Sequence, residues 1–128
     1  IGFIAYEENE YESASELFDE ARSEGIQGNN ISYFQSDMNF KLGNFQKAID
    51  LGLEKLPKSN AHERSQLNKI IGESYFNLKD YTSAIQYLKD YKGDRGKWNN
   101  TDYYQLGYAY YQTGQYELAI DEFSKILD

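Results

Sequence analysis

Cysteine is absent from this chain of 128 residues, and proline, histidine and tryptophan occur once each. Without cysteine there is no disulfide framework and no thiolate metal site, and one histidine is too few for a cluster of histidine ligands. The absence of cysteine fits the cytoplasm and the periplasm equally, so the compartment stays unknown. A single proline is compatible with helices along most of the chain.

Long hydrophobic runs are also missing. No stretch of about 18 apolar residues occurs, so we expect no membrane-spanning helix, and no signal peptide is recognisable at the start. The chain begins at Ile1 without methionine, inside an apolar helical pattern, and stops at Asp128 within another. We therefore expect it to be a fragment of a longer repeat protein.

Basic residues are in the minority, since 13 Lys and Arg stand against 21 Asp and Glu and the net charge is −8. Residues 1–28 hold eight of the acidic residues and only Arg22 as a base, a local balance of −7. The remaining hundred residues are nearly neutral, with 13 acidic and 12 basic side chains. Nucleic-acid binding requires a basic face, so we expect no nucleic-acid partner.

The pattern that is present has a period of about 35 residues. Four alanines lie 34, 36 and 35 residues apart, and an aromatic residue lies three positions before each of them. The pairs are Tyr11 and Ala14, Phe45 and Ala48, Tyr81 and Ala84, and Tyr116 and Ala119. A small residue at a fixed place in each repeat allows two helices to cross closely, so the spacing predicts a series of helix pairs.

The last predicted helix pair, residues 103–127, carries the fullest pattern. Its first helix contains Leu106-Gly107 and Tyr110, and its second contains Ala119 and Phe123. This series resembles the tetratricopeptide repeat, whose first helix (helix A) carries W-x2-L-G-x2-Y and whose second (helix B) carries A-x3-F. The resemblance implies an all-α, right-handed α-solenoid of antiparallel helix pairs.

About four repeats are expected in a single domain over residues 1–128, approximately 1–28 (truncated), 29–59, 60–97 and 98–128. The helices are expected at about Ile1–Glu8 and Tyr11–Ser23, Asn30–Leu42 and Phe45–Leu56, Ala61–Leu78 and Tyr81–Tyr91, and from near Asn100 to Leu127. Repeat two is the poorest match, because Gln35 and Asn39 stand where Leu and Tyr are usual and Gly52 stands inside helix B. A glycine inside a helix costs ~1 kcal/mol relative to alanine, so we expect this repeat to be the least stable.

Capping residues mark several helix starts. Asn60 with Glu63 resembles a capping box, and Asp80 is placed to cap the helix that follows it. Trp98 and Tyr103 fit a hydrophobic staple around an Asn cap at Asn99. Before them, the segment Lys92–Lys97, with two glycines and four charged residues, is expected to be a solvated loop.

The resemblance also implies that certain helix A positions line a concave groove. Carried over by alignment, these are Phe3, Tyr6 and Glu7 in repeat one, Tyr33, Asp37, Phe40 and Lys41 in repeat two, Lys69, Glu73, Phe76 and Asn77 in repeat three, and Tyr104, Tyr108, Tyr111 and Gln112 in repeat four.

One of these positions is aromatic in every repeat, and its members are Tyr6, Phe40, Phe76 and Tyr111. Two interpretations stay open. The rings form a ladder that grips an extended or helical peptide, since Tyr gives a large contact area at low entropic cost; or they pack against the next helix for stability. Tyr104 and Tyr108 favour binding, because the core does not require them.

Other kinds of site are not supported. A clamp for a terminal carboxylate would need amides where Phe3, Asp37 and Glu73 stand, and acids there would repel a carboxylate. The loop Lys92–Lys97 lacks the spacing of a phosphate-binding loop. His62 beside Glu63 has no nucleophile or metal set around it. We therefore predict no enzyme activity and no cofactor.

The leading hypothesis is a non-catalytic scaffold that binds a peptide or helix in its groove. Because aromatics there are mixed with Asp37, Glu73 and Glu7, we expect ligands that are apolar and basic. The alternative is a structural spacer within a longer superhelix, which could associate end to end through uncovered repeat faces. A narrower form of it is a bacterial envelope-assembly protein, by analogy with Tyr- and Asn-rich repeats of outer-membrane assembly lipoproteins. An enzyme domain elsewhere in a parent chain would leave no trace here.

Overall fold

The computed structural model describes residues 11–23 and 31–127, and all regular elements within these ranges are helices. They are α2 (Tyr11–Ser23), α3 (Ile31–Lys41), α4 (Phe45–Lys55), the short 3₁₀ helix η1 (Leu56–Lys58), α5 (Ala61–Asn77), α6 (Tyr81–Leu88), α7 (Asn100–Gln112) and α8 (Tyr116–Ser124). The all-α, helical-repeat fold is confirmed. The chain divides into two compact units, Ile1–Lys58 and Ser59–Asp128, here called unit 1 and unit 2.

Helix B begins where the sequence pattern places it, at the aromatic residue three positions before each repeat alanine. Tyr11, Phe45, Tyr81 and Tyr116 are the first residues of α2, α4, α6 and α8. The four alanines, Ala14, Ala48, Ala84 and Ala119, are all buried. Alanine leaves space for a crossing helix at these positions, so the four predicted pairs mark four helices B.

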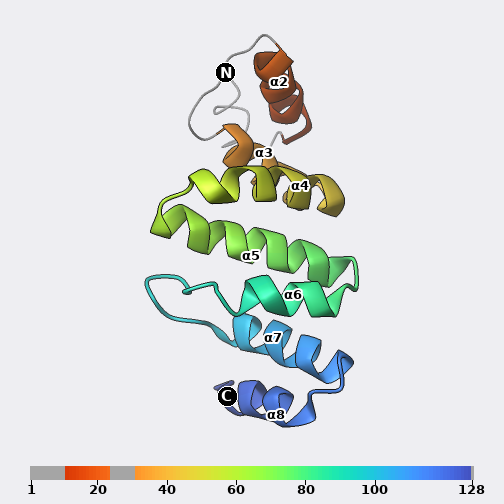
Figure 1. Ribbon diagram of the computed structural model, residues 1–128, viewed down its shortest axis with the longest axis vertical. Coiled ribbons are helices and arrows are strands. Elements are labelled where there is room, and N and C mark those ends of the chain that lie inside the picture. The colour runs from red at the N-terminus through yellow and green to blue at the C-terminus, as the bar shows by residue number, and fades with distance from the viewer. Residues whose placement is uncertain (1–10, 24–30, 128) are drawn as a thin grey trace. The chain divides into compact units, whose positions relative to one another are not determined.

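In unit 1, α3 packs against both α2 and α4 (Figure 1). Ala14, Phe18, Ile31 and Met38 form an apolar cluster between α2 and α3, with Phe34 packed against them. The two residues that depart from the repeat pattern, Gln35 and Asn39, lie inside α3 and are completely buried.

These buried amides are tied to their surroundings by hydrogen bonds. Gln35 Nε2 donates to Asp19 Oδ1 at 2.6 Å, so α3 is linked to α2. Asn39 Nδ2 donates to the Gln35 carbonyl oxygen at 2.7 Å, and Asn44 Nδ2 donates to Asn39 Oδ1 at 3.2 Å. Polar contacts therefore replace the apolar packing that Leu and Tyr would make at these two positions.

In unit 2, α5 packs against α6, α6 against α7, and α7 against α8 (Figure 1). Glycine permits the closest of these approaches. A Cβ added to Gly72 on α5 would lie 2.9 Å from the backbone nitrogen of Leu88 on α6, and one added to Gly107 on α7 would lie 2.7 Å from a ring carbon of Phe123 on α8. The small residues in the pattern thus lie where neighbouring helices nearly touch.

The predicted caps are confirmed. Asn60 and Glu63 form a reciprocal capping box, and the Asp80 carboxylate accepts from the Ser83 backbone N–H at 3.2 Å. The rings of Trp98 and Tyr103 lie 5.4 Å apart around the cap at Asn99, as a hydrophobic staple requires.

Two helices end three residues before the expected bounds. α6 ends at Leu88 instead of Tyr91, because Asp90 and Tyr91 donate to carbonyls three residues back and tighten the last turn. α8 ends at Ser124 instead of Leu127. Asn100 holds the segment that follows, since its side chain exchanges two hydrogen bonds with the backbone of Leu127.

Candidate functional site

In unit 2, α5 and α7 face each other across three side-chain pairs. Lys69 Nζ lies 3.6 Å from Asp102 Oδ1, and Gln105 Nε2 donates to Glu73 Oε2 at 2.7 Å. The rings of Phe76 and Tyr108 lie 5.7 Å apart. The three α5 residues follow a spacing of four and three, and the α7 residues a spacing of three, so each set occupies one face of its helix. We call this row of six residues the α5–α7 surface.

The charged end of the α5–α7 surface is largely closed by its own contacts. The Asp102 side chain is 5% exposed, and its Oδ2 accepts from the Asn99 backbone N–H at 3.0 Å. Lys69 Nζ also lies 4.9 Å above the ring of Tyr91. Burial alone would lower the pKa of Lys69, but the nearby Glu73, Asp102 and Tyr91 outweigh it and raise the pKa. Lys69 is therefore held as an ammonium ion.

Glu73 lies in the middle of the surface, and its neighbours compensate its negative charge only in part. Burial raises the pKa of Glu73, and the charge of Asp102 raises it further. The hydrogen bond from Gln105 and the charge of Lys69 lower the pKa of Glu73, but they do not cancel the effect of burial. An additional cation at Glu73 would stabilise its ionised form.

The other end of the surface is aromatic. Tyr81, at the start of α6, makes edge contacts with both Phe76 and Tyr108, at 5.5 and 5.7 Å between ring centroids. Tyr104 stacks on Tyr108 at 5.9 Å and contacts Phe123 at 6.1 Å, yet it is 49% exposed. This is a large amphipathic ring held by neighbours and open to a ligand.

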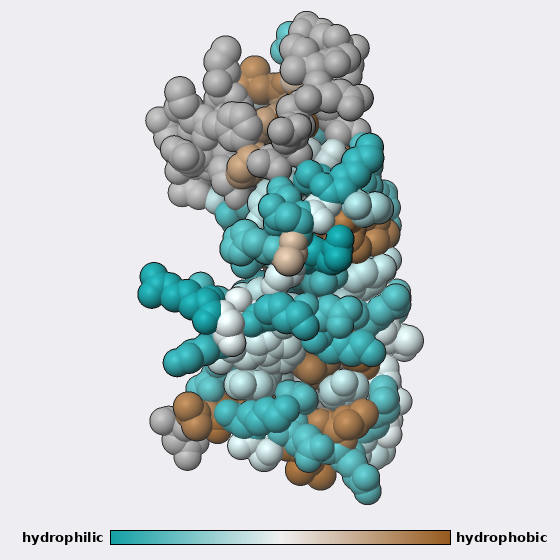
Figure 2. Space-filling view, turned by 60° about the vertical axis from the view of Figure 1, so that its left-hand side comes forward, coloured by the Kyte–Doolittle hydropathy of each residue, from teal (hydrophilic) through white to brown (hydrophobic). Residues whose placement is uncertain are grey.

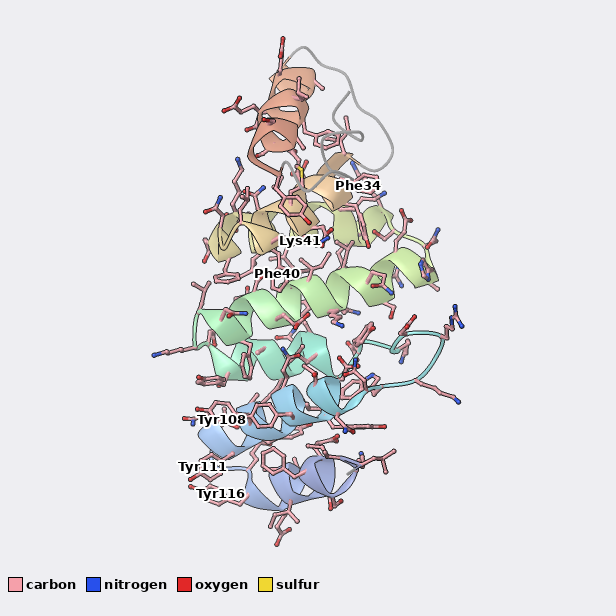
Figure 3. All side chains as sticks on the ribbon, turned by 180° about the vertical axis from the view of Figure 1, so that it is seen from behind. Phe34, Phe40, Lys41, Tyr108, Tyr111 and Tyr116 are labelled. Atoms are coloured by element: carbon pink, nitrogen blue, oxygen red, sulfur yellow. The ribbon has the colours of Figure 1, made fainter. Side chains whose placement is uncertain are left out.

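Tyr108, Tyr111 and Tyr116 point away from the end of unit 2 that carries the loop between α6 and α7 (Figure 3). Tyr111 and Tyr116 pair at 5.6 Å, and both are more than half exposed, at 53% and 59%. The aromatic end therefore continues from Tyr108 to the turn between α7 and α8.

The predicted ladder residues share one contact. Phe40 lies 5.8 Å from Phe45, Phe76 lies 5.5 Å from Tyr81, and Tyr111 lies 5.6 Å from Tyr116. In each case the partner is the first residue of helix B in the same repeat, so this position does pack against the following helix. Phe76 also reaches Tyr108 of the next repeat. Tyr6, the fourth member, lies outside the described residues, as do Phe3 and Glu7.

The predicted groove residues of unit 1 form a smaller group on α3. Lys41 Nζ pairs with Asp37 Oδ2 at 3.0 Å and lies 5.4 Å above the ring of Tyr11 on α2. Burial would lower the pKa of Lys41, but Asp37 and Tyr11 outweigh it and raise the pKa. Tyr33 meets Phe34 edge to face at 5.5 Å. The Asp37 carboxylate is thus already paired with a base.

The structure therefore brings together Lys69, Glu73, Phe76 and Tyr108 from the predicted set, with Tyr104 beside them, while Gln112 and Asn77 are exposed on their helices. Asp102 and Gln105 belong to the surface but were not predicted. The sequence feature that could have identified them is the constant offset of 32 or 33 residues between partners, 69 to 102, 73 to 105 and 76 to 108. This offset can be recognised only when the two helices A are aligned face to face.

Among the residues that the structure describes, no group of three or more His, Asp or Glu side chains is placed to hold a metal ion. Over the same residues, none of the helices is long and apolar enough to cross a membrane.

Comparison with known proteins agrees with this architecture. Residues 70–94 and residues 103–128 each match a family model described as tetratricopeptide repeat. These segments cover the end of α5 with α6, and α7 with α8, so the resemblance seen in the sequence is confirmed. No curated protein matches the chain in sequence.

Solved structures of MamA share the fold. MamA MSR-1 aligns with a TM-score of 0.80 and 17% identity over 97% of this chain and 70% of its own length. Two MamA AMB-1 structures each align with a TM-score of 0.82 and 16% identity over 97% of this chain, and over 66% and 71% of their own lengths. The chain thus spans about two thirds of these proteins, and identities this low concern the fold alone.

Proposed function

We propose that this chain, which carries tetratricopeptide repeats, is a non-catalytic scaffold whose α5–α7 surface binds an apolar and basic peptide segment of another protein. The repeats themselves are typical of protein–protein interaction scaffolds. The observation that carries the proposal is geometric: the half-buried carboxylate of Glu73 lies one helical turn from Phe76, whose ring contacts Tyr108, and Tyr108 stacks on the exposed Tyr104.

A ligand side chain with a positive charge would supply the compensation that Glu73 lacks. Lys69 is occupied by Asp102 and Tyr91, so it does not neutralise Glu73 fully. An apolar ligand residue next to that charge would contact Tyr104 and Tyr108, whose rings stack on each other. Tyr104 is exposed and Tyr108 is half-buried, and rings that are already held by their neighbours are favourable contact residues because little rotamer freedom is lost on binding.

The proposal is tested by competition between two unlabelled peptides for a fluorescent peptide of alternating Lys and Leu. A Lys/Leu competitor should displace it, and an acidic peptide without aromatics should not. Tyr104→Ala should weaken binding by about tenfold, the loss typical of one well-placed aromatic contact. Tyr87→Ala is the matched control, because Tyr87 packs on Tyr75 away from this surface and should leave the affinity unchanged. Displacement by the acidic peptide alone would overturn the proposal.

A second candidate function is a structural spacer that stacks on further repeats. A narrower version of this hypothesis places the spacer in a bacterial envelope-assembly protein. The observation that favours it is the apolar exposure of α8 and the residues after it, where Leu118 is 44%, Ile120 65% and Leu127 78% exposed. Stacking of another helix would cover these side chains. Sedimentation at several protein concentrations measures this association. The spacer is favoured if the association persists in Tyr104→Ala and is lost in Ile120→Asp.

A further inference from the structure

Unit 2 has a recessed surface that the peptide proposal does not use. On α7, Tyr104, Tyr108 and Tyr111 belong to the aromatic end described above, while Tyr103, Leu106 and Tyr110 lie on a different face of the same helix. These last three line a cleft of 610 Å³, together with residues of α6, α8 and the loop between α6 and α7. We call it the lysine cleft.

The lysine cleft is basic, in contrast to the acidic chain around it. Four lysines line it, Lys89, Lys92, Lys97 and Lys125, against one carboxylate, Glu122. Glu122 is already paired with Lys125, whose Nζ lies 3.2 Å from Glu122 Oε1. Among the described residues, the other three lysines have no carboxylate within ion-pair distance. The cleft therefore presents three lysines that form no ion pair within this part of the chain.

Aromatic rings in mutual contact form part of the cleft wall. The ring of Trp98 stacks on Tyr91 at 6.3 Å and lies 5.4 Å from Tyr103, and its Nε1 donates to the Tyr91 carbonyl oxygen at 2.7 Å. Lys125 Nζ lies 5.8 Å above the ring of Tyr103. The walls thus combine aromatic rings with ammonium groups, which suits a ligand with both apolar and negative parts.

The loop that carries Lys92 and Lys97 is a defined turn (Figure 1). Lys97 N–H donates to the Asp94 carbonyl oxygen at 3.0 Å, and the two residues between them have positive φ, 54° at Arg95 and 78° at Gly96, as in a type I′ turn. A Cβ on Gly93 would lie 2.4 Å from the Lys97 backbone. At the other end, the Lys92 N–H donates to Ser65 Oγ on α5 at 2.9 Å. The loop is therefore held at both ends beside the cleft.

We propose that the lysine cleft is a second docking site, for an acidic segment of a partner protein that also carries an apolar side chain. Asp and Glu side chains would pair with Lys89, Lys92 and Lys97, and the apolar side chain would pack against Trp98 and Tyr110. A short acidic segment can lie wholly beside the lysines, whereas a nucleic acid would extend beyond the cleft and be repelled by the rest of a chain of net charge −8. Figure 2, which brings the side with this loop forward, shows a mainly hydrophilic surface.

Trp98 makes the test direct, because it is the only tryptophan in the chain and it lines the cleft. Its emission is followed while the intact chain is titrated with a peptide of alternating Glu and Leu, and with the same peptide carrying Gln for Glu. The Glu peptide should change the emission saturably and the Gln peptide should not. Raising the ionic strength from about 0.1 M to about 1 M, which shortens the Debye length from about 10 Å to about 3 Å, should weaken binding strongly.

Matched variants locate the site. Lys92→Gln/Lys97→Gln should reduce the affinity for the Glu peptide by about tenfold, as expected for the loss of two exposed ion pairs. Lys58→Gln/Lys79→Gln removes the same charge from exposed lysines outside the cleft and should leave the affinity within about twofold. Tyr104→Ala should also bind normally, so failure of this site and failure of the α5–α7 surface are distinguishable.

Five results would overturn the proposal. Four of them are no response of Trp98 to the Glu peptide, equal binding of the Gln peptide, equal losses in the two lysine double variants, and tighter binding of a single-stranded oligonucleotide than of the Glu peptide. Association of the chain with itself that is abolished by Lys92→Gln/Lys97→Gln would also overturn it, because the occupant would then be the acidic part of a second copy.

Discussion

Gly72 and Gly107 occupy the same place in two successive helices A, but they approach different kinds of atom. The missing Cβ of Gly72 faces the backbone nitrogen of Leu88, whereas that of Gly107 faces only the ring of Phe123. A ring can shift within its rotamer, while a backbone can yield only if two helices separate.

Gly72→Ala should therefore destabilise the protein by ~1–3 kcal/mol, the usual cost of overpacking. Gly107→Ala should cost at least ~1 kcal/mol less, because the ring adjusts and alanine is the better helix former. Urea denaturation of the two variants measures this difference. Equal losses, or a larger loss for Gly107→Ala, would show that the α5–α6 approach is no tighter than the α7–α8 approach.

The raised pKa of Glu73 predicts how the stability of the protein depends on pH. Its pKa in the folded protein is raised above the ordinary value of 4.5, so its contribution to stability is present below the ordinary pKa and is lost as the pH rises through the folded pKa. Glu73→Gln cannot ionise, so it removes this loss of stability. Its amide oxygen can still accept the hydrogen bond from Gln105 Nε2.

The variant should be more stable than the parent at about pH 7, by ~1 kcal/mol or less, and the difference should vanish near about pH 4. The melting temperatures of both proteins are measured at the two pH values. Because the other titrating groups are the same in both proteins, their effects cancel in the difference between variant and parent. A variant less stable than the parent at neutral pH would mean that Lys69 compensates Glu73 fully.

At the scale of the helix, side-chain caps should separate otherwise similar helix starts. Asn99 forms a reciprocal capping box with Asp102 at the start of α7, whereas Gln115 before α8 makes no side-chain capping bond. Asn99→Ala should cost ~1 kcal/mol, and Gln115→Ala should cost less than ~0.5 kcal/mol. Thermal unfolding followed by the emission of Trp98 measures both. Similar losses in the two variants would contradict the assignment of the cap.

Helix starts were predictable from sequence because they depend on local chemistry. An aromatic residue before a small one, or an Asn before an acid, acts within a few residues of the chain, and both signals placed helices correctly. Helix ends were less predictable, since α6 and α8 end through tight turns that no single residue announces. The face-to-face pairs of the α5–α7 surface were only half predicted, because Asp102 and Gln105 gain their partners from a helix more than 30 residues away.

At the scale of the whole molecule, stability is expected to vary along the chain. α3 buries Gln35 and Asn39 where the repeat pattern has apolar residues, and Gln35 Oε1 has no hydrogen-bond partner among the described residues. α5 buries Leu67, Ile70 and Ile71 in the corresponding helix of the next repeat. An unsatisfied buried carbonyl costs ~1–3 kcal/mol.

The backbone amides of α3 should therefore exchange with deuterium faster than those of α5. Faster exchange is how the predicted low stability of repeat two would be observed in solution. Exchange followed by mass spectrometry of peptides from the two helices compares them within one sample. Slower exchange in α3 than in α5 would show that the buried amide network stabilises this repeat as well as apolar packing would.

Peptide binding at the α5–α7 surface can be located residue by residue by NMR of the 15N-labelled protein. On addition of the Lys/Leu peptide, the largest shift changes should fall on Glu73, Phe76, Tyr104, Gln105 and Tyr108, and Tyr104→Ala should reduce the affinity. Changes confined to other faces of the molecule, or none at saturating peptide, would contradict the account.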